Sequence, residues 1–372
     1  MPPPAMPARL LRQDKFLAVG IATALAFFLG GPRLLGDLSQ PLWLLFVFAW
    51  LFLAILGSAL AVVRHADHLA QRLGEPYGTL ILTLSVTAIE AVAISSVMVH
   101  SGHQPTLVRD TLFAVIMLLL NGLVGVSLLV GGWRHREQSY NLQGANAYLG
   151  VIIPIAMMSL ILPDFTQTTP GPTLSVTQES VLALMSLGLY GAFLAIQTGR
   201  HRGFFTFEND DAAGAKAAAG DAGSPWYHAL LLIAYMVPIV YLAELLADPL
   251  DYMTSSWGAP AAIGGVLIAI LVATPEAIGA IRAAAANHLQ RSVNILLGSV
   301  LSTIGLTIPV MLVVSQVSGR RIVLGVEHAN FVMLLLTLFL SVVTFGSGRT
   351  NVLQGFVHLL LFVSYFLLIF QG

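Results

Sequence analysis

Long apolar stretches separated by short polar connectors run along the whole chain. A helix needs about 20 apolar residues to cross the hydrocarbon core of a bilayer, at about 1.5 Å per residue. We expect helices rather than barrel strands, because each stretch is too long for a strand and must satisfy its own backbone. The pattern predicts eleven membrane-spanning helices, over residues 16–36, 41–63, 77–100, 107–132, 145–162, 179–199, 226–247, 260–286, 291–317, 322–345 and 352–370.

Composition supports a membrane protein and excludes several other classes. Hydrophobic residues make up 57% of the 372 residues and charged residues only 9%, whereas soluble domains carry about 25% charged residues. The net charge of −1 gives no basic surface for nucleic acid. Cysteine is absent, which excludes disulfides, thiolate metal sites and cysteine nucleophiles. The H-E-x-x-H and G-x-S-x-G motifs are also absent, so we expect neither an enzyme nor a cofactor.

The basic residues beside the spans predict the orientation in the membrane. Loops on the cytoplasmic side carry an excess of Lys and Arg. With the N-terminus inside, four of the 17 basic residues lie outside, namely Arg33, Arg109, Arg320 and Arg321, and the other thirteen lie inside. We therefore expect a multi-pass protein surrounded by membrane lipid, with a cytoplasmic N-terminus and an external C-terminus.

Matching spacings in the two halves of the chain indicate an internal repeat. Three features recur: an aspartate nine residues before a proline, a glutamate fourteen or sixteen residues after that proline, and an arginine followed twelve residues later by a polar residue. In the first half these are Asp67, Pro76, Glu90, Arg109 and Asn121, and in the second Asp251, Pro260, Glu276, Arg291 and Thr303.

A five-helix unit must insert its second copy upside down relative to the first. The predicted architecture is an all-α polytopic membrane protein of one extra N-terminal helix and two inverted five-helix repeats. Residues 1–38 hold the N-terminal lead and first helix, 39–200 the first repeat, 201–225 a cytoplasmic linker and 226–372 the second repeat.

Glu90 and Glu276 are each the only acidic residue in their apolar span, and they are the strongest candidates for function. A carboxylate at the depth of a bilayer costs about 3 kcal/mol or more if ionised, so its presence indicates a role. Each glutamate lies roughly 21 to 24 Å along its helix from the preceding proline, near mid-membrane. Inverted topology would bring the two together as one site for a metal cation and for protons.

Neutral oxygens near both glutamates suit a hard cation, which prefers carboxylate, hydroxyl and carbonyl ligands. Thr87 precedes Glu90 by three residues, and Thr274 lies two residues before Glu276. Pro275 has no N–H, so it leaves the carbonyl of Leu271 without its helical partner and available to a cation. The helices that follow add Asn121, Ser302 and Thr303 as further candidate ligands.

Other polar residues of the spans have weaker claims to function. Asp67 and Glu244 lie near predicted helix ends, where solvation competes with a role in an access path. Histidines recur with i,i+3 spacing at His65 and His68 and again at His100 and His103. Both pairs lie at span ends, where tuning of proton access is favoured over a metal site.

Two segments of the sequence resemble the paired motifs of the calcium/cation antiporter superfamily. They are SVTAIEAVAISSVM, at 85–98, and LVATPEAIGAIRAAAANHLQRSVNILLGSVLSTIGLTIP, at 271–309, and the similarity includes RDTLFAVIMLLLNGLVGVSLLVGG, at 109–132. Within the superfamily the chain resembles bacterial ChaA-type cation/proton antiporters. The resemblance implies an inner-membrane exchanger that moves Ca²⁺, or Na⁺ and K⁺, outward against inward protons.

By position, Glu90 and Glu276 match the family's central acidic residues, and Asn121 and Ser302 its polar residues on the following helices. The chain departs from many Ca²⁺/H⁺ exchangers at the Gly-Asn pair that precedes each acidic residue. Here the pairs are Val86-Thr87 and Val272-Ala273, which removes two amide oxygens. Either Thr87, Thr274 and the break at Pro275 substitute for them, or the preferred ion is monovalent.

A transport mechanism follows from the chemistry of two carboxylates at one site. Loss of hydration and mutual repulsion favour protonation when no metal is present. A Ca²⁺ ion supplies the compensating charge, displaces the protons, and leaves when protons return from the other side. The predicted function is Ca²⁺/H⁺ antiport by alternating access. The alternatives are Na⁺(K⁺)/H⁺ antiport on the same fold and, less favoured, a cation channel.

Overall fold

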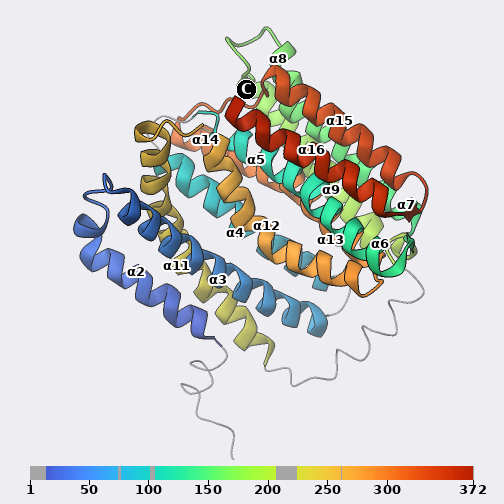
Figure 1. Ribbon diagram of the computed structural model, residues 1–372, viewed down its shortest axis with the longest axis horizontal. Helices are drawn as coiled ribbons and strands as arrows, with labels where there is room; N and C mark the ends of the chain where they lie inside the picture. The colour runs from blue at the N-terminus through green and yellow to red at the C-terminus, as the bar shows by residue number, and fades with distance from the viewer. Residues whose placement is uncertain (1–13, 74–76, 101–104, 207–223, 261, 372) are drawn as a thin grey trace, which may run out of the picture. The chain divides into compact units, whose positions relative to one another are not determined.

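The computed structural model describes residues 14–73, 77–100, 105–206, 224–260 and 262–371, and this part of the chain is almost entirely helical (Figure 1). The elements are α2 Lys15–Leu34, α3 Pro41–Leu73, α4 Tyr77–His100, α5 Leu107–Met117, η1 Leu118–Leu123, α6 Val124–His135, β1 Gln138–Ser139, α7 Leu142–Ala156, η2 Met157–Ile161, α8 Leu162–Phe165, α9 Val176–Thr198, η3 Arg202–Phe204, α11 Pro225–Ser256, α12 Ala262–Ala285, α13 Leu289–Ser302, η4 Thr303–Thr307, α14 Ile308–Ser318, α15 His328–Phe345, β2 Arg349–Thr350 and α16 Val352–Gln371.

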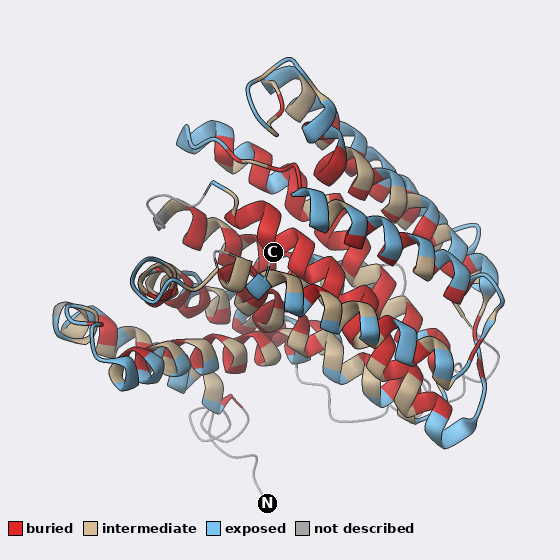
Figure 2. Cartoon of the chain, turned by 45° about the horizontal axis from the view of Figure 1, so that its top comes forward, coloured by how far each residue is buried: buried red, intermediate tan, exposed pale blue. Residues whose placement is uncertain are grey.

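The described residues contain the membrane helices that the hydropathy pattern predicts. Nine helical stretches are long and apolar enough to cross a bilayer, and two shorter apolar stretches lie at Lys15–Gly31 and Thr83–Val99. Many helices have buried residues on one side and exposed residues on the other, as Figure 2 shows, and large apolar side chains are among those exposed. On α16, for example, Leu360 and Leu367 are exposed while Tyr365 is buried. This pattern suits helices that face lipid on one side and protein on the other, and it confirms an all-α membrane protein.

The helices form two compact units, which do not follow the halves of the sequence. The first unit contains α2, α3, α4 and α11, and the second contains the remaining helices. Each unit therefore draws helices from both of the predicted repeats, so a repeat is not a separate body in space.

In the first unit, α3 packs against α2, α4 and α11 (Figure 1). Leu51, Ile55 and Val62 on α3 are completely buried. The approach of α2 to α3 is close at Gly57, where an added Cβ would lie 2.5 Å from Phe16 Cδ1. A larger residue at this position would have to displace Phe16, so glycine allows the two helices to pack.

In the second unit, α16 packs on α6 and η1, and α12 packs on α5. Glycines form both contacts: a Cβ on Gly125 would lie 3.0 Å from the Gly355 carbonyl oxygen, and one on Gly265 would lie 2.7 Å from backbone atoms of Asp110 and Thr111. The two short strands pair antiparallel, with Gln138 opposite Thr350 and Ser139 opposite Arg349. They join the turn after α6 to the turn before α16.

Two helices extend further in the structure than the hydropathy pattern predicts. The helix predicted to end at Val63 continues to Leu73, and the one predicted to end at Ala247 continues to Ser256. Residues 64–73 contain no glycine or proline, so polarity marks where the span leaves the apolar region without ending the helix. Pro249 lies inside α11 and is buried. A proline removes only one main-chain bond, and burial of its ring offsets that loss.

One helix begins later in the structure than the sequence predicts. The span predicted from Ile322 starts as α15 only at His328. The N–H groups of Val323, Gly325 and Val326 donate to the carbonyls of Pro105, Pro172 and Leu160. These bonds hold the segment outside a helix, and hydropathy contains no information about them.

Two sequence features fall mainly outside the described residues. They are most of the predicted linker, at 207–223, and His103, while His100 ends α4 without a described side chain. The described part of the linker includes the short helix η3.

Candidate functional site

Glu90 lies near the middle of α4, in the first unit, and its side chain is buried at 3% exposure. Thr87 lies one helical turn earlier and is also buried, at 5% exposure. Ser85 donates to the carbonyl of Ile81 at 2.6 Å, so its proton is used within the helix. By contrast, no hydrogen-bond partner for Thr87 Oγ1 occurs among the described residues. A buried hydroxyl of this kind normally has a partner, which favours Thr87 as a ligand for something that the fold itself does not supply.

Glu276 lies in α12, in the second unit, and is half-buried. Pro275 is inside this helix, which continues to Ala285. Because proline cannot donate a hydrogen bond, the buried residue Leu271 presents a carbonyl without its usual main-chain partner. Thr274 donates to the carbonyl of Ile270 at 2.6 Å. Its proton is therefore committed, and its oxygen offers only lone pairs.

The two helices that follow the glutamates in the sequence contain matching irregular segments. Asn121 lies in the π-helical segment η1, and Thr303 begins the π-helical segment η4. Each segment lies inside a long span, at Leu107–His135 and Leu289–Ser318. π-helical turns are rare and frequently occur at functional sites, and their presence at the two positions paired by the sequence spacing supports both residues.

Within the second unit, α12 packs against η1 and α13. The unit therefore gathers Glu276, Thr274 and Leu271 of α12 with the helices that carry the other second-unit candidates. Asn121, Ser302 and Thr303 are all buried. Ser302 donates to the carbonyl of Ser299 at 2.9 Å. The first unit contains Glu90 and Thr87 together with Asp67 and Glu244.

Asn121 is held by residues of α15 and α16 that the sequence did not indicate. Its Nδ2 donates to Thr337 Oγ1 at 2.7 Å, and its Oδ1 lies 3.2 Å from His358 Nδ1. The Thr337 hydroxyl donates to the Met333 carbonyl, so it accepts from Asn121 and fixes the direction of the amide. His358 Nδ1 must then carry a proton, and its Nε2 accepts from Thr344 Oγ1 at 2.9 Å.

This chain of bonds makes His358 a buried support for Asn121. Nδ1 donates to only one lone pair of Asn121 Oδ1, which leaves the second lone pair for a cation. His358 is separated from Asn121 by 237 residues, and sequence spacing does not relate them. The sequence feature that could have indicated this role is a histidine inside an apolar span. His358 has no second histidine at i,i+3 spacing, so it does not belong to the histidine pairs.

The two proposed access-path residues do not lie at helix ends, in contrast to the prediction. Asp67 precedes the end of α3 by six residues and is exposed, whereas Glu244 is half-buried and lies twelve residues before the end of α11. The reason is the extension of both helices beyond their predicted limits. A capping role is therefore excluded for Glu244.

Comparison with known proteins identifies relatives over most of the chain. The family model described as "Sodium/calcium exchanger protein" matches residues 43–199 and 227–371. These two ranges coincide closely with the two predicted five-helix sets. The sodium-potassium/proton antiporter ChaA of Escherichia coli (strain K12) is 40% identical over 321 residues, which cover 86% of this chain and 87% of the relative.

More distant similarities are to a further antiporter sequence and to a solved structure. The Ca²⁺/H⁺ antiporter ChaA of Bacillus subtilis (strain 168) is 22% identical over 273 residues, covering 70% of this chain and 77% of the relative. The solved structure of native YfkE superposes with a TM-score of 0.73 at 19% identity, covering 96% of this chain and 100% of that one.

Proposed function

Because the chain belongs to the sodium/calcium exchanger protein family, we propose that it is a secondary active antiporter that exports Ca²⁺ in exchange for protons. The observation that carries the proposal is the pair of glutamates inside apolar helices, with Glu90 almost completely buried. An intramembrane carboxylate is retained for a function that outweighs its cost. Reversible binding of a cation or a proton is such a function, and it needs no cofactor and no covalent step.

We assign cation and proton binding to Glu90 and Glu276. Neutral oxygens come from Thr87, Thr274, Asn121, Ser302, Thr303 and the carbonyl of Leu271. The open hydroxyl of Thr87, the proline beside Glu276 and the paired π-helical segments support these assignments. That both carboxylates act on one ion is a prediction from the repeated sequence. Asp67 and Glu244 are assigned to the access path.

The exchange cycle follows from competition for the same oxygens. Protons and a metal cation both neutralise the carboxylates, so the arrival of one favours the departure of the other. Exposure of the site to one side of the membrane at a time converts this competition into exchange. The excess of basic residues in the predicted inner loops favours a cytoplasmic N-terminus in a bacterial inner membrane.

Na⁺ or K⁺ is the second candidate cargo. The relative with 40% identity is named a sodium-potassium/proton antiporter, and the chain carries Val86-Thr87 and Val272-Ala273 where amide oxygens would favour Ca²⁺. Monovalent ions tolerate a site with fewer charged and amide oxygens than Ca²⁺, which takes six to eight oxygen ligands.

Proteoliposomes that contain Ca²⁺, Na⁺ or K⁺ in turn, with internal pH recorded, test the proposal and identify the cargo. An outward cation gradient should acidify the lumen for the transported ion only. A channel would pass the cation without moving protons, so cation flux with no pH change would replace the proposal by that alternative. Glu137→Gln, on an exposed turn, is the control for the loss of a carboxylate outside the proposed site.

A further inference from the structure

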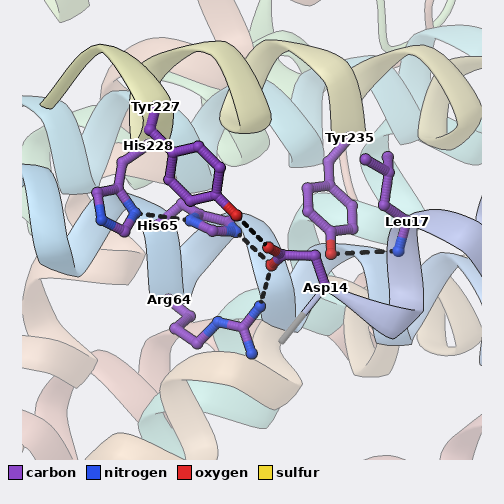
Figure 3. A network of polar contacts seen from close by, with 7 residues as sticks. All are labelled: Asp14, Leu17, Arg64, His65, Tyr227, His228 and Tyr235. Carbon is purple, nitrogen blue, oxygen red and sulfur yellow. Dashed lines mark hydrogen bonds and ion pairs between the residues drawn. The ribbon is translucent and has the colours of Figure 1, made fainter. Parts of the chain in front are cut away.

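A buried polar cluster joins three helices of the first unit at the start of α2 (Figure 3). Asp14, immediately before α2, is only 3% exposed. Its Oδ1 accepts from Arg64 Nη2 at 2.6 Å and from His65 Nε2 at 2.9 Å, both on α3. Its Oδ2 accepts from the Tyr227 hydroxyl of α11 at 2.8 Å. The carboxylate therefore connects α2 to α3 and to α11.

A second connection between α3 and α11 is made by two histidines. His65 Nδ1 lies 2.9 Å from His228 Nδ1, and both rings are buried, at 3% and 7% exposure. Because Asp14 accepts at Nε2, that nitrogen of His65 carries a proton. In the neutral pair, His228 Nδ1 then donates to His65 Nδ1. The bond exists only while a proton lies between the two Nδ1 atoms.

The geometry limits how many protons the pair can hold. One extra proton fits, because it can occupy His228 Nε2 while the Nδ1 atoms still share the proton between them. With a second extra proton all four ring nitrogens carry hydrogen. Two N–H donors would then face each other across 2.9 Å, without an acceptor and with two positive charges. The contact between the two Nδ1 atoms cannot persist in that state.

The groups around the pair act in opposite directions on an extra proton. Asp14 is the buried anion in contact with His65, and Arg64 already occupies the same oxygen. His68 stacks on His228 with ring centroids 4.8 Å apart, and Tyr227 and Tyr235 lie beside His65. On α2, Lys15 lies over the Phe16 ring.

The unit carries further ionisable groups, among them the exposed Asp67, two residues after His65. The helix α4 carries Glu90 and, at its end, His100. On α11, Glu244 follows His228 by sixteen residues, about 24 Å along the helix. The first extra proton, Arg64 and a protonated His68 would all repel a second proton, and Asp14 is the carboxylate in contact with His65 that attracts it.

We propose that His65 and His228 form a proton-binding site, built from residues other than the two glutamates, in which a second extra proton separates α11 from α3 and from the start of α2. The ligand is the proton itself, and the response is a change in the distance between helices. This site extends beyond cation exchange, since it needs neither a transported cation nor Glu90 or Glu276.

The absence of cysteine allows a direct distance measurement on the full chain. Val19→Cys on α2 and Leu230→Cys on α11, both exposed, would carry spin labels in lipid nanodiscs. Distances are recorded without a cation gradient from about pH 8 to about pH 5, the range over which histidine titrates. We expect one short distance at high pH and a second, longer distance that replaces it as the pH falls.

Substitutions at the pair test whether the histidines cause this step. His228→Gln offers an amide donor to His65 but cannot gain a proton, so the short distance should persist at every pH. His65→Gln, which keeps a donor toward Asp14, should do the same and serves if the first variant does not fold. His135→Gln, in the second unit and exposed, should leave the step unchanged. His68→Gln should move the step to higher pH, because one opposing charge is gone.

Two results would overturn the proposal: a wild-type distance that does not depend on pH, or a step that persists in both His228→Gln and His65→Gln. Glu276→Gln provides the separation from the proposed function. The distance step should survive in that variant even though exchange is lost, and a step abolished by Glu276→Gln would assign the response to the cation site instead.

Discussion

Glu90 and Glu276 occupy matching positions in the sequence, but their helices offer them different supporting oxygens. Near Glu90, the buried Thr87 hydroxyl has no partner among the described residues, and α4 contains no proline. Near Glu276, the Thr274 hydroxyl is bonded to its own helix, and Pro275 exposes a main-chain carbonyl instead. Glu90 is almost completely buried, whereas Glu276 is half-buried.

This difference indicates two ways of making one apolar helix suitable for a cation. A side-chain hydroxyl leaves the helix regular and costs little stability, while a proline sacrifices a main-chain bond to free a carbonyl. The two predicted repeats therefore share the carboxylate and differ in the neutral oxygens beside it. Substitutions near Glu90 and near Glu276 that have unequal effects can test this interpretation.

Removal of either carboxylate should have the largest effect on cation binding. The loss should be similar for Glu90 and for Glu276, despite their different supporting oxygens. Glu90→Gln and Glu276→Gln each keep the shape and lose the charge. We expect a loss of about 3 kcal/mol in cation binding, or roughly 100-fold in exchange rate at limiting cation. Cation-driven pH change in proteoliposomes measures it, with Glu137→Gln as the control. Exchange by either variant at the wild-type rate contradicts the assigned role.

The membrane helices were predictable from the sequence because lipid imposes strict requirements on them. Each span must satisfy its own backbone and expose apolar side chains, so length and hydropathy place it well. The errors lie where tertiary contacts decide. Residues 322–326 are as apolar as a helix start, yet Val323 and Val326 donate to carbonyls of other segments. No local pattern encodes those partners.

The candidate site was predictable where the chemistry is unusual for its surroundings. An acidic residue in an apolar span is visible in any sequence, and the repeat doubles the indication. The hydrogen-bond partners of Asn121 were not predictable, because Thr337 and His358 reach it from helices distant in sequence. The network at Asp14 was missed for the same reason, since His65 meets His228 across 163 residues.

The second-largest effect on cation binding is expected from loss of the hydrogen bonds that hold Asn121, which lies in the same unit as Glu276. His358→Leu removes the donor to Asn121 Oδ1 and the acceptor for Thr344. A hydrogen-bonding partner behind a ligand commonly changes cation affinity by about tenfold, and we expect the KM for the cation to rise by that factor. His358→Gln restores one bond and should recover part of the affinity. An unchanged KM in His358→Leu would remove Asn121 from the cation site.

Restoring the helical bond beside Glu276 should weaken exchange while stabilising the protein. Pro275→Ala gives the Leu271 carbonyl an N–H partner, and an alanine is favoured over proline inside a helix. Occupation of that carbonyl is worth about 1 kcal/mol, or roughly fivefold in cation affinity. Thermal unfolding should shift upward at the same time. Pro249→Ala, in α11, is the matched control for loss of a helical proline and should leave the affinity unchanged.

The smallest effect tests the comparison most closely, because it uses the same substitution on both sides. Thr87→Val removes a buried hydroxyl without a partner among the described residues, so the cation KM should rise about threefold, near the value of one neutral hydrogen bond. Thr274→Val removes a half-buried hydroxyl that donates to the Ile270 carbonyl, and water can take its place at the cation, so its effect should stay below about twofold. Titration of exchange against cation concentration measures both. Equal effects, or a larger effect at Thr274, would show that both threonine hydroxyls contribute to cation binding. The carbonyl freed by Pro275 would then not replace a hydroxyl ligand.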